Sequence, residues 1–129
     1  MAIYASDVQR LSNWLKWEEF PDSGTTREVI AKTATNATLT GSVLDSNYQL
    51  VVAATLADAS FILIDDLTRP SAAEFTQALL LARGKAKVGK RAVIFGADVT
   101  TDVQKQTAFA NLALKEIFAV DQIDVSVTR

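Results

Sequence analysis

The chain of 129 residues contains neither cysteine nor histidine. Without cysteine there are no disulfides, thiolate nucleophiles or cysteine-based zinc sites. Without histidine there is no Ser-His-Asp triad, no common general base near neutral pH and no usual soft-metal ligand. These absences remove several routes to catalysis, and the lack of cysteine is compatible with a reducing cytosol.

Long apolar runs are missing as well. The longest apolar stretches, LVVAATLA and ALLLA, are far too short to span a membrane. The start, MAIYASDVQR, has no basic region followed by an apolar run, so we expect no secretion signal. The 13 cationic and 15 acidic residues are mixed along the chain and leave a net charge of −2. Binding to DNA or anionic lipid would therefore have to be local.

The length and the 49% of hydrophobic residues are typical of one folded domain, with or without an arm. From Arg27 onward the sequence is rich in threonine and valine and favours strands. We predict strands near 27–33, 42–45, 48–53 and 60–66, with a hairpin turn at Asp45-Ser46-Asn47. The strand SFILIDD is apolar in its centre and is predicted to be buried on both faces.

The clearest helix is predicted over residues 100–120, where Thr101 and Gln104 form a capping-box pattern. Its apolar face is predicted to hold Val103, Ala110, Ala113, Leu114 and Ile117, bordered by Phe109. The alternating QIDVSVT that follows predicts a half-buried strand. Residues 70–82 are ambiguous, because Ser71 and Glu74 favour a helix start while ALLLAR also fits a strand.

The stretch ARGKAKVGKRAVIFG crowds five cations into nine positions. It resembles a phosphate-binding loop, but such a loop needs serine or threonine after Lys90 and must open a helix. Here Arg91 follows, and RAVIFG is predicted to be a strand. We expect a strand pair with cations on an exposed turn. Contact with nucleic acid, or with an acidic patch on a protein partner, remains an alternative. Asp65 and Asp66 would point to opposite faces of a strand, and are predicted to end it and start a turn.

Three aromatic residues, Trp14, Trp17 and Phe20, crowd together just before the loop PDSGTT. Residues 6–20 could open as a helix through Ser6 and Gln9, although an extended form stays possible. The aromatic residues are either a core cluster or part of a terminal arm that orders onto a protein partner.

The order of short motifs between Arg27 and Ala119 resembles the lambda-type bacteriophage head decoration, or capsid-stabilising, family. The motifs are REVIAKTA with GSVL, then SFILIDD, ALLLARGKAKV, AVIFGADV and QKQTAFANLAL. The resemblance implies a mainly β, α+β fold, with a β-clip-like body, one late helix and an N-terminal arm. It favours a turn at 69–75 and a strand at 77–83.

The same resemblance implies a non-enzymatic protein that binds the major capsid protein as a homotrimer and stabilises the expanded capsid. Residues 1–26 would form a capsid-binding arm and residues 27–129 the body. Made in the host cytoplasm, the protein would end on the capsid exterior, with no cofactor, metal, nucleic acid, membrane or small-molecule substrate. The predicted capsid-binding residues are Trp14, Trp17, Phe20, Thr25, Thr26, Arg27, Glu28, Val29 and Ile30. The alternative is a small non-enzymatic adaptor that binds another protein through the aromatic segment.

Overall fold

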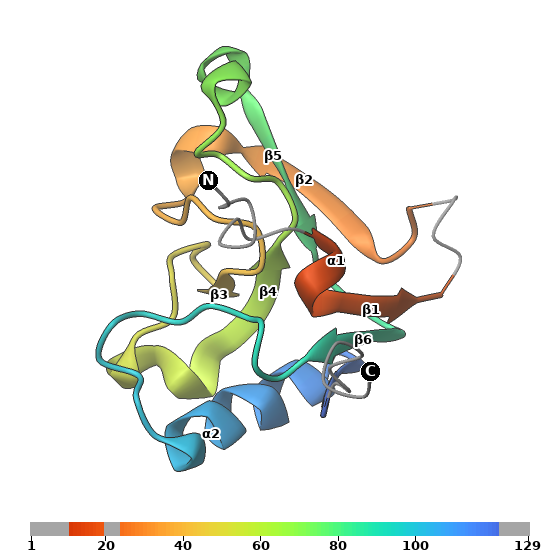
Figure 1. Cartoon of the computed structure of the whole chain (residues 1–129), viewed down its shortest axis with the longest axis vertical. Coiled ribbons are helices and arrows are strands. Elements are labelled where there is room, and N and C mark those ends of the chain that lie inside the picture. The colour runs from red at the N-terminus through yellow and green to blue at the C-terminus, as the bar shows by residue number, and fades with distance from the viewer. Residues whose placement is uncertain (1–10, 20–23, 122–129) are drawn as a thin grey trace, which may run out of the picture.

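The protein contains two β-sheets in a computed structural model that describes residues 11–19 and 24–121 (Figure 1). The four-stranded sheet has the order β2-β5-β4-β3 and the three-stranded sheet the order β1-β6-β7. The predicted mainly β, α+β fold with one long helix late in the chain is confirmed. The strands are β1 (Leu15–Glu18), β2 (Arg27–Ala31), β3 (Val43–Asp45), β4 (Ala59–Leu63), β5 (Gln77–Leu81), β6 (Ala86–Gly89) and β7 (Ile117–Val120). The helices are α1 (Leu11–Trp14), α2 (Asp102–Ala113) and three 3₁₀ segments, η3 (Lys32–Ala34), η4 (Ala53–Asp58) and η5 (Pro70–Glu74).

Strand β4 lies inside the four-stranded sheet and is almost fully buried, as its apolar sequence predicts. The turn before it is also confirmed, because the Asp45 carboxylate accepts the N–H groups of Asn47 and Gln49 at 2.8 and 3.1 Å. The strand predicted at 48–53 is wrong. Only Leu50 makes a β-bridge there, and the N–H of Val52 donates to the Thr55 hydroxyl at 2.9 Å, which starts η4 instead.

The ambiguous residues 70–82 form a 3₁₀ turn, η5, followed by strand β5. Residues 77–81 form a strand because β5 pairs antiparallel on both sides, with β2 and with β4. A helix at this position would leave β2 without a paired strand and β4 paired with β3 alone. The strand prediction for 77–83 is therefore confirmed in its position, with its end at Leu81.

The basic stretch does not form the expected strand pair. Strand β5 stays in one sheet, whereas β6 pairs with β1 and β7 in the other. Gly84 makes this crossing possible, because a Cβ atom there would lie 1.9 Å from the carbonyl oxygen of Glu116. Residues 91–96 were also predicted to be a strand, which is wrong. They form turns, and Ile94 alone makes a bridge there: its N–H donates to the Gly41 carbonyl and its carbonyl accepts the N–H of Val43, which pairs it with Ser42.

The capping box of α2 is confirmed: the Thr101 hydroxyl accepts the N–H of Gln104 at 3.2 Å, and the Gln104 side chain accepts the N–H of Thr101. The predicted apolar face is wrong. Ala108 and Leu112 are the buried residues of α2, whereas Val103 is 73% exposed and Leu114 83% exposed.

The helix also ends earlier than predicted, at Ala113, because the chain reverses at Glu116 (φ 63°) and continues as β7. Strand β7 runs parallel to β6. The strand predicted from QIDVSVT lies outside the described residues. Within the described ranges, no helix has the length and apolar character needed to cross a membrane.

Trp14 belongs to the core. Its side chain is fully buried in a cluster with residues of both sheets and of α2, among them Leu81, Val88 and Leu112. The indole N–H donates to the Thr40 hydroxyl at 2.9 Å, so the polar atom of this large side chain is satisfied. The helix that could extend over 6–20 does not continue past Trp14, because β1 begins at the next residue and pairs with β6.

Replacing Trp14 by alanine is expected to destabilise the protein by roughly 3–5 kcal/mol, since it leaves a large cavity and removes the indole hydrogen bond to the buried Thr40 hydroxyl. Trp17→Ala is the matched control. Its indole is half exposed and contacts Lys87, so the expected loss is about 1 kcal/mol. Urea unfolding followed by far-UV circular dichroism measures both. Equal losses would contradict the core position of Trp14.

Candidate functional site

The predicted capsid-binding residues occupy different environments. Trp14 and Thr26 are buried, Arg27 and Ile30 are half-buried, and Trp17, Thr25, Glu28 and Val29 are exposed. Phe20 lies outside the described residues. Six of these residues, 25–30, are consecutive and lead into β2, which places them at one edge of the four-stranded sheet (Figure 1).

Strand β2 offers a free backbone edge. It pairs with β5 on one side, and within the described residues no strand lies on the other. The N–H of Lys32 donates to the Thr76 carbonyl, and the N–H of Ala82 donates to the Thr26 carbonyl. Because hydrogen-bonded positions alternate along an antiparallel pair, Glu28 and Ile30 bond to β5. The backbone groups of Val29 and Ala31 therefore point away from the sheet, toward any strand that approaches.

A partly buried ion pair holds this edge against the other sheet. The Glu18 carboxylate accepts hydrogen bonds from the Thr26 hydroxyl at 2.5 Å and from the Arg27 Nε at 3.2 Å, and it also pairs with the Arg27 Nη2. Burial alone would raise the pKa of Glu18, but the hydrogen bonds from Arg27 and Thr26 and the attraction of the guanidinium lower it below the usual 4.5. The same contacts raise the pKa of Arg27, mainly through its hydrogen bond to Glu18. Both groups are therefore charged at neutral pH.

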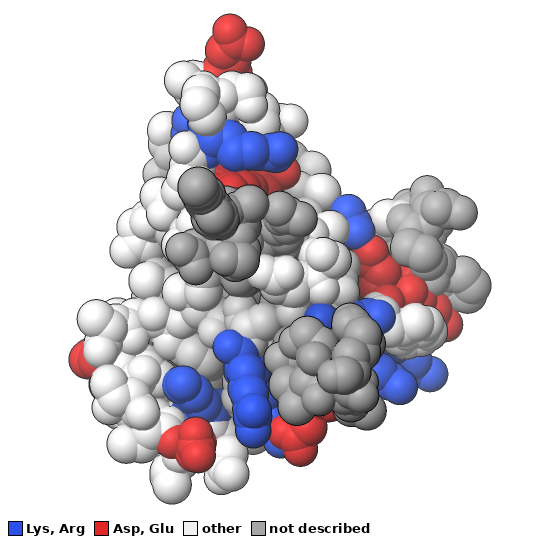
Figure 2. Space-filling view, in the orientation of Figure 1, with Lys and Arg blue, Asp and Glu red and all other residues white. Residues whose placement is uncertain are grey.

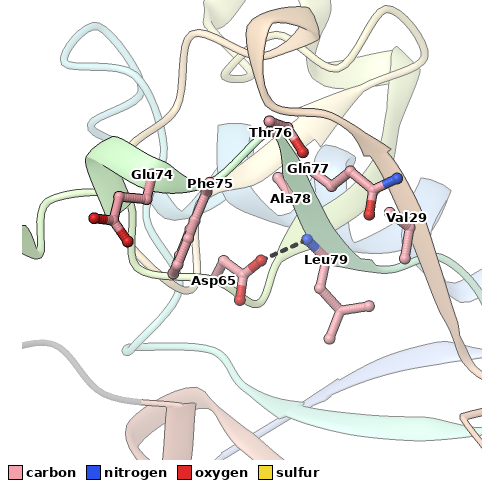
Figure 3. A pocket seen from close by; sticks show the side chains of 8 residues that line it. All are labelled: Val29, Asp65, Glu74, Phe75, Thr76, Gln77, Ala78 and Leu79. Carbon is pink, nitrogen blue, oxygen red and sulfur yellow. Dashed lines mark hydrogen bonds between the residues drawn. The ribbon is translucent and has the colours of Figure 1, made fainter. Parts of the chain in front are cut away.

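An open groove of about 440 Å³ lies on the face of the sheet beside β2 (Figure 3). Val29 lies opposite Leu79 of β5, and Phe75 closes the far side. The Asp65 carboxylate reaches into the groove and accepts the N–H of Leu79 at 2.8 Å. Sequence reasoning missed Phe75 and Leu79 as surface residues, because only the register of β2 against β5 brings them beside Val29.

The two adjacent aspartates serve the backbone separately. Asp65 bonds to β5, whereas the Asp66 carboxylate accepts the N–H of Thr68 at 3.0 Å. The predicted strand end and turn are confirmed at this position, since β4 ends at Leu63. Within the described ranges, no cluster of three or more acidic side chains is arranged to hold a metal ion.

The cations of the basic stretch are dispersed. Arg83 pairs with Glu28 at 2.6 Å, and Lys90 lies 3.7 Å from Asp121. Turns follow Lys90, so this glycine-flanked segment does not lead into a helix as a phosphate-binding loop does. Figure 2 shows basic and acidic side chains interspersed over the visible face, without one broad basic area.

A free strand edge, an open groove beside it and an exposed tryptophan are features of a protein that binds other proteins. The family model described as "Bacteriophage lambda head decoration protein D" matches residues 6–117. The chain therefore belongs to the lambda head decoration family, whose members are structural proteins of the phage capsid. No curated protein and no solved structure matches the chain.

Glu18→Gln is expected to destabilise the protein by about 1–3 kcal/mol at pH 7, because Arg27 loses its counter-charge and a charge-assisted bond. The folded pKa of Glu18 lies below the unfolded value. Its contribution is thus fully present above the unfolded pKa of 4.5 and is lost as the pH falls through the folded pKa. The stability difference between wild type and variant should therefore shrink in acid.

Urea unfolding from pH 7 down to pH 3 measures this difference. Glu28→Gln is the control, since its ion pair with Arg83 is exposed and contributes at most about 1 kcal/mol. A wild-type to Glu18→Gln difference that stays constant across the pH range would show that the charge of Glu18 does not stabilise the fold.

Proposed function

We propose that the protein is a homotrimeric cement that binds the major capsid protein lattice and stabilises the expanded phage head. The observation that carries the proposal is the free edge of β2 in a member of the decoration family. A closed ring of three copies gives the symmetry of a three-fold point on an icosahedral shell. Many weak contacts then act together, so each one can be modest while the gain for the shell is large.

Strand addition is the proposed mode of binding. A segment of the capsid protein extends the four-stranded sheet by pairing with the outward backbone groups of Val29 and Ala31. Backbone hydrogen bonds supply affinity, and side chains of the added strand supply specificity through contacts with Val29 and the groove. Pairing of this kind needs no catalytic group, cofactor or small-molecule substrate.

In this proposal the aromatic segment both anchors the arm in the core and presents one exposed aromatic residue to the capsid. Residues 1–26 remain the capsid-binding arm, and residues 27–129 remain the body. The part of the arm from Leu11 to Glu18 is its anchor, because Trp14 lies in the core and β1 pairs with β6. Trp17 is the aromatic residue of this part that a capsid subunit can reach. Removing residues 1–24 would therefore disturb the body as well as binding.

Ala31→Pro is expected to abolish strand addition while the fold survives. The φ angle of Ala31 is −64°, which matches the value of about −65° that proline imposes. The lost N–H points away from β5, so the existing ladder keeps its hydrogen bonds. Uptake of the variant by expanded empty capsids, measured by co-sedimentation, should fall at least about tenfold, which corresponds to ~1.4 kcal/mol.

Ala31→Val is the matched control, because it keeps the N–H and suits a strand. Thermal unfolding of both variants checks the fold. If Ala31→Pro binds capsids as well as Ala31→Val does, strand addition at β2 is wrong. If the wild type is not taken up by capsids at all, the capsid-binding proposal itself fails, and an adaptor for another partner becomes the better explanation.

A further inference from the structure

A row of three side chains crosses the outer face of the three-stranded sheet. Lys87 of β6 lies opposite Trp17 of β1 on one side and opposite Phe118 of β7 on the other. Its neighbours along the strand, Ala86 and Val88, are buried, so Lys87 points away from the core. Trp17 is 49% exposed and Phe118 41% exposed. We call Trp17, Lys87 and Phe118 the aromatic row.

The row is an unusual surface for a small protein. Two large aromatic side chains stay half exposed on either side of Lys87, although each could bury a large area. The Lys87 ammonium lies 5.9 Å from the centre of the Trp17 ring, and the described residues provide it with no ion pair. Exposed aromatic residues of this size are characteristic of binding hot spots, where a partner removes them from water.

The charge of this face selects the partner. The exposed charged residues within β1, β6 and β7 are both lysines, Lys16 and Lys87, because Glu18 turns inward to Arg27. A contact that paired the row with the same row of a second copy would bring two Lys87 side chains together, which like-charge repulsion opposes. A complementary surface instead presents a carboxylate to Lys87 and apolar side chains to the two rings.

We propose that the aromatic row is a second docking site for the capsid shell, which receives an acidic and apolar segment of the major capsid protein. The inference rests on the proposed function. The row and the β2 edge are joined through the ion pair of Glu18 with Arg27, which links β1 to β2. One capsid subunit therefore meets two surfaces that are held in a constant relation.

Binding to expanded empty capsids tests the row with Lys87→Gln, Lys87→Glu and Phe118→Ala. Removing the charge should weaken binding, and reversing it should weaken binding further, with a difference that grows at low salt. Phe118→Ala should weaken binding by about tenfold or more. Val103→Ala and Lys105→Gln are the controls, because they remove an exposed apolar group and a charge from α2, and they should bind as the wild type does.

Thermal unfolding shows which variants keep the fold. Should Phe118→Ala unfold, the two Lys87 variants carry the test, since this side chain lies on the outer face. Row variants that bind like the wild type, while Ala31→Pro does not, would overturn the row and leave strand addition standing. Sedimentation of the free protein gives a further outcome. If Lys87→Glu dissociates the free trimer and leaves the capsid affinity of each subunit unchanged, the row faces a second copy and the inference is wrong.

Discussion

The ion pair between Glu18 and Arg27 joins the two sheets, and the binding surfaces depend on it. Glu18 ends β1 of the three-stranded sheet, and Arg27 begins β2 of the four-stranded sheet. Removing charged groups from water costs free energy. This partly buried ion pair therefore fixes the relative orientation of the two sheets more surely than it adds net stability. The Thr26 hydroxyl supplies a further hydrogen bond, which makes the geometry specific. The aromatic row and the β2 edge thereby keep one relative orientation before any partner arrives, and this reduces the entropy lost on binding.

An exposed strand edge carries a risk, because it can pair with any other strand. Strand β2 has only five residues, and its charged residues Arg27 and Glu28 are engaged by Glu18 and Arg83. Short length and charge are the usual protection of an edge strand against aggregation. A strand of the wrong sequence would have to displace these ion pairs and would gain only backbone hydrogen bonds in return. In the proposed strand addition, a capsid segment of the right sequence would also contact the groove beside Val29.

Local signals predicted the parts of the fold that local interactions build. The turn at Asp45 and the capping box of Thr101 with Gln104 depend on residues a few positions apart, and both were predicted from the sequence. The resemblance to the decoration family decided the strand at β5, which its own pattern left open. Long-range pairing could not be predicted in the same way. The early end of α2 at Ala113 follows from the parallel pairing of β7 with β6, and no residue nearby in the sequence is a helix-stop signal.

The candidate site likewise contains residues that the sequence predicted and residues that it did not. The residues of β2 were predicted as a binding strand, and their position at a sheet edge agrees with that prediction, which remains to be tested. Trp14 and Trp17 look equivalent in sequence, yet one is buried and the other exposed, because the chain changes from helix to strand between them. Phe118 was missed as a surface residue, since it was assigned to a helix that ends before it.

Gly84 lies where the chain leaves one sheet for the other, with the Glu116 carbonyl in the space that a side chain would fill. Its N–H donates to the Lys115 carbonyl at 2.7 Å, so this glycine also fixes the bend from α2 into β7. A larger residue here would push β7 away from β6 and separate Phe118 from Lys87. If the aromatic row docks on the shell as proposed, a substitution of Gly84 would weaken attachment, although Gly84 itself need not contact a capsid subunit.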